Sequence, residues 1–128
     1  MIEGVVNTAR EAVVPLAVAG PAGPTRPIDA VIDTGFNGFL TLPAALVSEL
    51  RLPFVTRGRA TLANGSEDFF DIHNAVVIWD GQPRRILTDV ADTAPLAGMS
   101  LLDGHSLYVE VEEGGRVTIR AGAQQAAH

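Results

Sequence analysis

Cysteine is absent from the 128-residue sequence, which excludes disulfide bonds, thiolate nucleophiles and cysteine-based metal sites. Histidine is also scarce, with three residues in the chain. Any catalytic chemistry must therefore come from carboxylates, hydroxyls or these few imidazoles. A chain without disulfides fits a reducing compartment, and we expect a cytoplasmic location.

Long apolar runs and basic residues are lacking as well. No run approaches the ~18 apolar residues of a membrane span, and the amino terminus, Met1 to Gly4, lacks the basic start of a signal peptide. Nine Lys and Arg residues stand against fifteen Asp and Glu residues, which gives a formal net charge of -6. This sign is wrong for a protein that binds by neutralising phosphates. We therefore expect neither a membrane nor a nucleic acid as a partner.

Motifs for metals and nucleotides are missing too. Asp71 lies two residues before His73, and Asp103 lies two residues before His105, but neither spacing matches a zinc site. The sequence has no Walker-type loop and no GxSxG elbow. We predict that the protein uses no metal and no cofactor.

The patterns that are present indicate one mostly β domain. A chain of this length with 47% apolar residues is sufficient for a single hydrophobic core, which we place in residues 1–120, with residues 121–128 as a disordered tail. Alternating apolar and polar residues predict a series of strands. They cover residues 2–7, 12–19, 27–32, 54–62, 67–79, 84–90, 107–112 and 117–119. Short helices are expected at 43–50 and 99–103, and many strands with one or two short helices favour a barrel or a sandwich.

The last two strands are predicted to form a hairpin. Leu107, Val109 and Val111 alternate with polar residues and are expected to face the core. Gly114 and Gly115 supply the turn before the second strand of this hairpin.

The segment that begins at Ala30 and ends at Pro43 carries the most specific chemical signal. Asp33 follows an apolar run and opens a glycine-rich turn through Thr34 and Gly35. A carboxylate beside a buried strand is unfavourable unless it is paired, hydrogen-bonded or protonated, so its position indicates a function. The simpler interpretation is a turn, because Asp, Thr and Gly are common turn residues and the tripeptide occurs by chance in roughly a few per cent of chains of this length.

Two further segments give the tripeptide a context. The segment from Pro95 to Leu102 is apolar and contains a glycine, and Asn64-Gly65, between it and the tripeptide, predicts a hairpin with a tight type I′ turn. With these parts in this order, the sequence from Glu3 to Arg120 resembles the retropepsin-like aspartic proteases, and especially their small bacterial relatives. The resemblance implies a mostly β fold, a single acid-protease lobe that closes like a barrel.

The resemblance also implies roles for individual residues. Asp33 would supply a catalytic carboxylate, Thr34 a hydroxyl that hydrogen-bonds across to a partner loop, and Gly35 would keep the loop thin. The segment from Leu96 to Gly98 would pack behind this loop, and the hairpin would form a flap over the cleft. Substrate-binding positions are expected in the flap and beside the catalytic tripeptide, at Phe36, Leu62, Ala63, Asn64 and Gly65.

One Asp-Thr-Gly tripeptide is half of an aspartic-protease site. Two carboxylates in contact cannot both ionise, so one accepts a proton from water while the other donates one to the substrate carbonyl. A symmetric dimer supplies the second carboxylate. The sequence therefore predicts a homodimeric aspartic endopeptidase that cleaves extended polypeptide through Asp33 of each subunit.

Three positions depart from the family pattern. Phe36 stands where Ala or Ser is common, Ala97 is smaller than the usual aliphatic residue, and Ser100 replaces a frequent Asp. The catalytic group is retained, but the shape of the pocket and the substrate preference stay open. Two other interpretations also stay open: a non-catalytic peptide-binding or dimerisation module with the same fold, and an unrelated β-barrel that contains the tripeptide by chance.

Overall fold

A computed structural model describes residues 1–21 and 23–122 of the chain. These residues form ten strands and two short helices, so the prediction of a mostly β fold is confirmed. The elements are β1 (Ile2–Val6), β2 (Ala12–Ala19), β3 (Thr25–Ile32), β4 (Leu40–Leu42), α1 (Ala44–Glu49), β5 (Phe54–Thr61), β6 (Glu67–Trp79), β7 (Gln82–Val90), β8 (Leu96–Ala97), α2 (Met99–Leu102), β9 (His105–Val109) and β10 (Arg116–Ala121).

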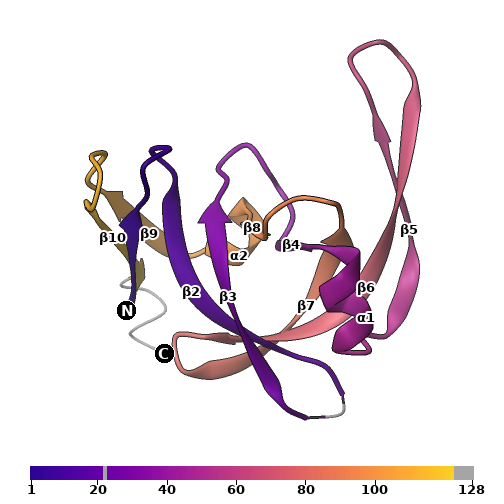
Figure 1. Cartoon of the computed structure of the whole chain (residues 1–128), viewed down its shortest axis with the longest axis horizontal. Coiled ribbons are helices and arrows are strands. Elements are labelled where there is room, and N and C mark those ends of the chain that lie inside the picture. The colour runs from indigo at the N-terminus through magenta and orange to yellow at the C-terminus, as the bar shows by residue number, and fades with distance from the viewer. Residues whose placement is uncertain (22, 123–128) are drawn as a thin grey trace.

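Most of the strands close into a ring. The sheet order is β5-β6-β7-β4-β8-β3-β2-β1-β10-β9, and β6 also pairs with β2. This second pairing aligns Ala17 with Ile78 and Ala19 with Val76. It closes the six strands β6, β7, β4, β8, β3 and β2 into a ring. The barrel-like closure expected from the sequence is therefore present, with β5 on one side of the ring and β1, β10 and β9 on the other (Figure 1).

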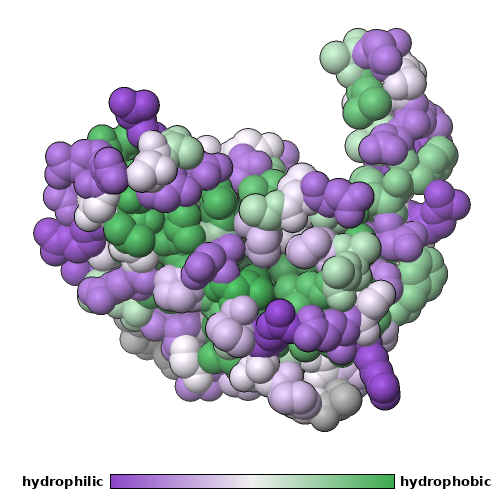
Figure 2. All heavy atoms as spheres, viewed as in Figure 1, coloured by the Kyte–Doolittle hydropathy of each residue, from purple (hydrophilic) through white to green (hydrophobic). Residues whose placement is uncertain are grey.

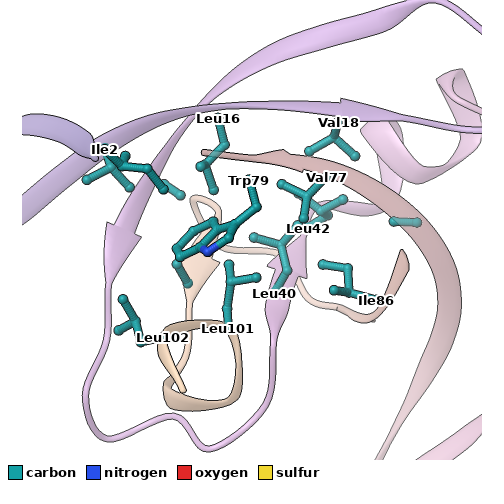
Figure 3. Close-up of a cluster of buried hydrophobic side chains, with 14 of the residues drawn as sticks. Ile2, Leu16, Val18, Leu40, Leu42, Val77, Trp79, Ile86, Leu101 and Leu102 are labelled. Atoms are coloured by element: carbon teal, nitrogen blue, oxygen red, sulfur yellow. The ribbon is translucent and has the colours of Figure 1, made fainter. Parts of the chain in front are cut away.

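The hydrophobic core fills the inside of this ring. Leu40 and Leu42 of β4, Trp79 of β6 and Leu101 of α2 point toward one another (Figure 3), and none of them is more than 6% exposed. Burial of apolar surface at roughly 25 cal/mol per Å² makes such a cluster the main source of stability. The core thereby fixes β4 and α2, the elements that flank the candidate site.

The end of β9 differs from the prediction. The strand stops at Val109, and Val111 is 67% exposed instead of facing the core. The chain leaves the sheet early because the N–H of Glu112 donates to the carbonyl of Glu110 and the N–H of Gly115 donates to that of Glu112. The predicted hairpin is confirmed, since β9 pairs antiparallel with β10.

The turn between β6 and β7 lies at Asp80-Gly81. Trp79 pairs with Gln82, and both turn residues have positive φ, 51° and 82°, as a type I′ turn requires. Strand β7 therefore begins at Gln82, earlier than the predicted start at residue 84. The Asp-Gly dipeptide is a strong hairpin signal, and it marks this turn in the sequence.

Both short helices occur where they are predicted. Helix α1 follows Pro43, which stands at its N-cap rather than inside its first turn. Helix α2 ends before Gly104, whose φ of 79° allows the reversal into β9. Strand β10 includes Ala121, and residues 123–128 of the predicted tail lie outside the described residues. Within the described ranges, no helix is long and apolar enough to cross a membrane.

Candidate active site

Asp33 lies at the carboxyl end of β3, in the middle of the sheet. Strand β3 pairs with β2 along its length and, at its end, runs parallel to β8, where Ile32 aligns with Ala97. The N–H of Asp33 continues this ladder by donating to the carbonyl of Ala97 at 2.9 Å. Two neighbouring strands therefore fix the backbone position of the carboxylate.

The Asp33 side chain closes the turn that follows it. Its Oδ1 accepts a hydrogen bond from the N–H of Gly35 at 2.9 Å, and its carbonyl accepts one from the N–H of Phe36 at 3.1 Å. The Asp33 side chain is half-buried, whereas Thr34 and Gly35 are exposed. One carboxylate oxygen is thus occupied by the turn, and the other has no hydrogen-bond partner in the described part of the chain. Residues 33–39, which connect the two strands, are called the β3–β4 loop below.

A hollow of about 400 Å³ opens beside Asp33 and Thr34. Its walls come from the turn between β1 and β2 and from strands β3, β8 and β9. The other lining residues are Arg10, Glu11, Ala12, Val31, Ile32, Leu96, Leu107 and Val109. A concave surface that combines apolar walls with convergent polar groups is typical of ligand sites, so the end of β3 is the candidate active site.

Arg10 lines this hollow from a strained turn. Its φ of 61° is unusual for a residue with a side chain. The Asn7 side chain maintains the turn, because its Oδ1 accepts hydrogen bonds from the N–H groups of Ala9 and Glu11 at 3.0 and 2.9 Å. No signal in the sequence indicates Arg10, because its place beside Asp33 depends on how the first three strands fold together.

Gly98 packs directly behind the β3–β4 loop. A Cβ atom at this position would lie 2.2 Å from the carbonyl oxygen of Gly38 and 2.6 Å from the Phe36 ring, so only glycine fits. The N–H of Gly98 donates to the carbonyl of Phe39 at 2.9 Å, and the N–H of Met99 donates to that of Phe36 at 2.8 Å. The late apolar segment therefore supports the loop from behind, in the position that the resemblance implied.

Two of the departures from the family pattern also belong to this support. The Phe36 ring lies over Gly38, where a Cβ atom would be 2.6 Å from it. The Ser100 hydroxyl donates to the carbonyl of Asn37, and the Ser100 N–H donates to the carbonyl of Gly38 at 3.1 Å. Phe36 is not among the residues that line the hollow beside the catalytic tripeptide. A substrate contact by Phe36 stays a prediction.

The hairpin of β5 and β6 projects from the end of the molecule at which the β3–β4 loop lies (Figure 1). In the space-filling view it stands clear of the body and leaves a hollowed surface beside its base (Figure 2). Leu62, at the tip, is 47% exposed, and Ala63, Asn64 and Gly65 are exposed as well. The structure therefore places the predicted flap residues together at this tip, apart from the catalytic tripeptide.

The turn at this tip is not the predicted type I′ turn. Gly65 has a φ of 84°, but Asn64 is not among the residues with positive φ. The N–H of Gly65 donates to the carbonyl of Leu62 at 2.9 Å and the N–H of Leu62 donates to that of Ser66 at 2.8 Å, the pattern of a type I turn with a glycine bulge. The Asn64 side chain favours this form, since its Oδ1 accepts the N–H of Ser66 at 3.0 Å.

The two faces of the hairpin differ in character. Gly58 aligns with Phe70, and a Cβ atom at Gly58 would lie 2.4 Å from the Phe70 ring, so the ring lies across the glycine. Ile72 is on the same face, because alternate residues of a strand share a face. The other face carries Phe69, whose ring centroid is 5.1 Å from the Arg57 guanidinium. Phe70 and Ile72 thus give the hairpin one apolar face, which the period-two pattern of residues 67–79 could have indicated.

His73 and His105, which each follow an aspartate by two residues, form hydrogen bonds within the fold. His73 Nδ1 lies 2.7 Å from the carbonyl oxygen of Leu52. His105 Nε2 accepts the indole N–H of Trp79 at 3.1 Å, and its Nδ1 lies 2.9 Å from the carbonyl oxygen of Asp103. Across the residues that the structure describes, no three His, Asp or Glu side chains are grouped to hold a metal ion.

Replacing His105 with Ala is expected to lower the free energy of unfolding by about 1–3 kcal/mol, because the buried Trp79 N–H loses its acceptor. Chemical denaturation measures the change. His105→Gln is the matched control, since its amide oxygen accepts the same hydrogen bond and is expected to restore most of the loss. Equal stability of the two variants would show that this hydrogen bond does not contribute.

Asp89 lies near the base of the hairpin, aligned with Thr41 of β4 and Ile72 of β6. Burial raises the pKa of the Asp89 carboxyl above its ordinary value. The folded state therefore holds this proton more tightly than the unfolded state does. The stability that the protonated form contributes is complete below the ordinary pKa and is lost as the pH rises through the raised pKa.

The Asp89→Asn variant is therefore expected to melt at a higher temperature than wild type at neutral pH. The difference should shrink as the pH falls toward about 4, where wild-type Asp89 is increasingly protonated. Thermal melts across this range measure it, with the exposed Asp29→Asn as control. A difference that is the same at every pH would contradict the assigned cause.

Comparison with known proteins adds the decisive observation. No protein-family model and no curated protein sequence matches this chain. Solved structures do match in three dimensions, and two of them are described here. EIAV protease complexed with the inhibitor HBY-793 covers 75% of this chain and 88% of its own, with a TM-score of 0.55 and 16% identity. A retropepsin-like aspartic protease from Rickettsia conorii covers 94% of this chain and 91% of its own, with a TM-score of 0.56 and 15% identity.

The chain has the retropepsin-like fold. This confirms the fold class expected from the tripeptide, the hairpin and the late apolar segment, and it excludes an unrelated β-barrel. The retropepsin-like lobe here carries its Asp-Thr-Gly tripeptide, residues 33–35, at the end of a central strand with a projecting hairpin above.

Proposed function

We propose that the protein is an aspartic endopeptidase whose active site forms between two copies of the chain. The observation that carries the proposal is the placement of Asp33 in a retropepsin-like fold, on a turn supported by Gly98 and beside a hollow with apolar and polar walls. A turn that served only to reverse the chain would need neither the close packing of Gly98 behind it nor a hollow beside its carboxylate.

The proposed chemistry requires two carboxylates that share one proton. Asp33 of each subunit faces its twin, and their mutual repulsion keeps one of them protonated. The ionised carboxylate removes a proton from water, which attacks the peptide carbonyl, while the protonated carboxylate donates its proton to the carbonyl oxygen. The Oδ1 bond to Gly35 holds each carboxylate in place and leaves the second oxygen for the partner and the water. Thr34 would brace the two loops by hydrogen-bonding across the dimer.

Dimerisation follows from the sequence in this proposal. The chain contains one Asp-Thr-Gly tripeptide, so a single copy supplies one of the two required acids. Twofold symmetry provides the other from an identical surface. The exposed position of Thr34 and Gly35 leaves the tripeptide accessible to a second copy.

The proposed substrate is an extended polypeptide segment held between the β3–β4 loop and the hairpin tip. Main-chain groups of Leu62, Ala63, Asn64 and Gly65 would bind the substrate backbone when the hairpin closes, and the closed flap would exclude water. The walls of the hollow beside Asp33 combine aliphatic side chains with Arg10 and Glu11, and apolar substrate side chains are expected to bind against the aliphatic part. In this proposal Phe36 affects the shape of the cleft indirectly, because its ring packs against Gly38 and Gly98 and so positions the β3–β4 loop.

Digestion of a peptide library at mildly acidic pH, followed by mass spectrometry, tests the proposed activity. Cleavage of internal peptide bonds with a shared preference for apolar side chains is expected. The plot of kcat/KM against pH is expected to be bell-shaped, because activity requires one proton on the carboxylate pair and is lost when the pair holds either two protons or none. A profile that rises to a plateau with increasing pH would contradict the shared proton.

A further inference from the structure

Arg84 lies on β7, on the same face of the strand as the buried side chain of Ile86. Its guanidinium group reaches α2, where Nη1 donates to the carbonyl of Leu101 at 3.0 Å and Nη2 donates to that of Ser100 at 3.4 Å. The group also lies over the Phe39 ring, 5.7 Å from its centroid. One side chain of β7 therefore contacts both α2 and the end of the β3–β4 loop.

Helix α2 needs an outside donor because it cannot satisfy its own carboxyl end. The last four carbonyl groups of an α-helix have no partner within the helix, and α2 consists of four residues, Met99–Leu102. The last turn of α2 contains no basic residue. Hydrogen bonds from a charged donor are stronger than those from a neutral one. Arg84 thus supplies from another strand the donor that the helix itself lacks.

Helix α2 in turn determines where the β3–β4 loop lies. Met99 and Ser100 donate three hydrogen bonds to the carbonyl groups of residues 36–38. Asp33 begins this loop, and its side chain closes the first turn. A continuous path of hydrogen bonds therefore joins Arg84, through α2, to the loop that carries the carboxylate.

A hollow of about 390 Å³ lies between Arg84, α2 and the β3–β4 loop. Side chains do not fill this space, so the guanidinium contacts take the place of close packing on this side of α2. Asp103 is the acidic residue that lines the hollow. Among the residues that the structure describes, no ion pair joins Arg84 to Asp103. The Arg84 donors are therefore directed to the carbonyl groups of α2 and not to a carboxylate.

We propose that Arg84 is a positioning residue for the Asp33 pair. By holding α2 against β7, it sets the position of the β3–β4 loop and with it the distance between the two Asp33 carboxylates. This inference rests on the proposed function, because the pair forms only between two copies of the chain. Arg84 touches neither the substrate nor the reacting atoms, and its effect on the reaction passes through α2 and the loop.

Arg84→Met in the full-length protein tests the proposal, because it removes the guanidinium group and keeps an unbranched side chain. The kcat for peptide cleavage is expected to fall by about 10- to 100-fold, since a displacement of roughly 1 Å at the reacting groups can cost this much. KM should change little, because no residue that binds the substrate is altered. Arg84→Lys keeps the charge but not the forked donor, and its kcat is expected to lie between those of wild type and Arg84→Met.

Arg85→Met is the matched control. Arg85 is the next residue of β7, faces the other side of the strand and is exposed. The same chemical change is thus made away from α2, and kcat is expected to stay at the wild-type value. An equal kcat for Arg84→Met and Arg85→Met would overturn the proposal.

The width of the plot of kcat/KM against pH separates positioning from a loss of folded protein. Repulsion between the two carboxylates keeps their two proton losses apart, and it weakens as the distance between them grows. A displaced loop should therefore give Arg84→Met a narrower bell than wild type. A loss of folded protein lowers the whole curve without changing its width. A lower curve of unchanged width would overturn the positioning role.

Amide hydrogen exchange tests the structural step without peptide cleavage. The amides of Met99 and Ser100 donate to the β3–β4 loop, and they are expected to exchange faster in Arg84→Met than in Arg85→Met. Faster exchange in a protein without peptidase activity would support the hold of Arg84 on the loop and contradict the proposed function. Unchanged exchange in an active protein would support the peptidase and overturn the role of Arg84.

Discussion

Replacing Asp33 with Asn is expected to reduce kcat/KM for peptide cleavage by at least about 10⁴-fold, because both members of the symmetric pair lose their acid–base function together. The fold should be retained. The Asn side-chain oxygen still accepts the N–H of Gly35, so the β3–β4 loop keeps its turn. Steady-state kinetics on a peptide from the library measures the loss, and thermal melting and size-exclusion chromatography check fold and dimer.

Asp29→Asn is the matched control for this experiment. Asp29 lies on the same strand, β3, and is exposed, so the same chemical change is made away from the hollow. Full activity is expected for this control. Equal peptidase activity of Asp33→Asn and wild type in a confirmed dimer would assign the cleavage to another group.

Replacing Gly98 with Ala is expected to lower the free energy of unfolding by about 3 kcal/mol and to reduce activity together with it. The added methyl group would lie 2.2 Å from the carbonyl oxygen of Gly38, so the β3–β4 loop must move away from β8. A displaced loop also moves Asp33 relative to its twin. Chemical denaturation and peptide kinetics measure the two effects on one protein sample.

The combination of Gly98→Ala with Phe36→Ala tests the cause of this loss. Phe36→Ala removes the ring that lies 2.6 Å from the new methyl group, but the Gly38 carbonyl belongs to the backbone and stays. The double variant is therefore expected to remain at least as unstable as Gly98→Ala alone. Recovery of stability in the double variant would show that the ring, and not the loop backbone, is the obstacle.

The long strands of this fold are readable from the sequence because period-two patterning extends over enough residues. The predicted bounds of β2 and β6 match the structure, and both strands carry alternating apolar residues. Strands β4 and β8 have three and two residues, which is too short for a period to be visible. They are strands because β4 pairs with β7 and β8, and β8 pairs with β3. These pairings depend on the fold of the whole chain and not on a local pattern.

The candidate site is readable from the sequence only in part. Asp33 and Gly98 carry local signals, a carboxylate after an apolar run and a glycine within one. Arg10 and Leu107 reach the same hollow from distant parts of the chain, and only the sheet order brings them there. The prediction of a type I′ turn at Asn64 is wrong because the Asn-Gly dipeptide does not reveal the hydrogen bond from the N–H of Ser66 to Asn64 Oδ1.

The distance between the two Asp33 carboxylates in a crystal structure of the dimer is the most direct test of the proposed chemistry. We expect oxygen atoms of the two side chains within about 3 Å of each other, or bridged by one water molecule, as a shared proton requires. A dimer that holds the two carboxylates well beyond the reach of one bridging water, or a protein that stays monomeric at high concentration, would contradict the account.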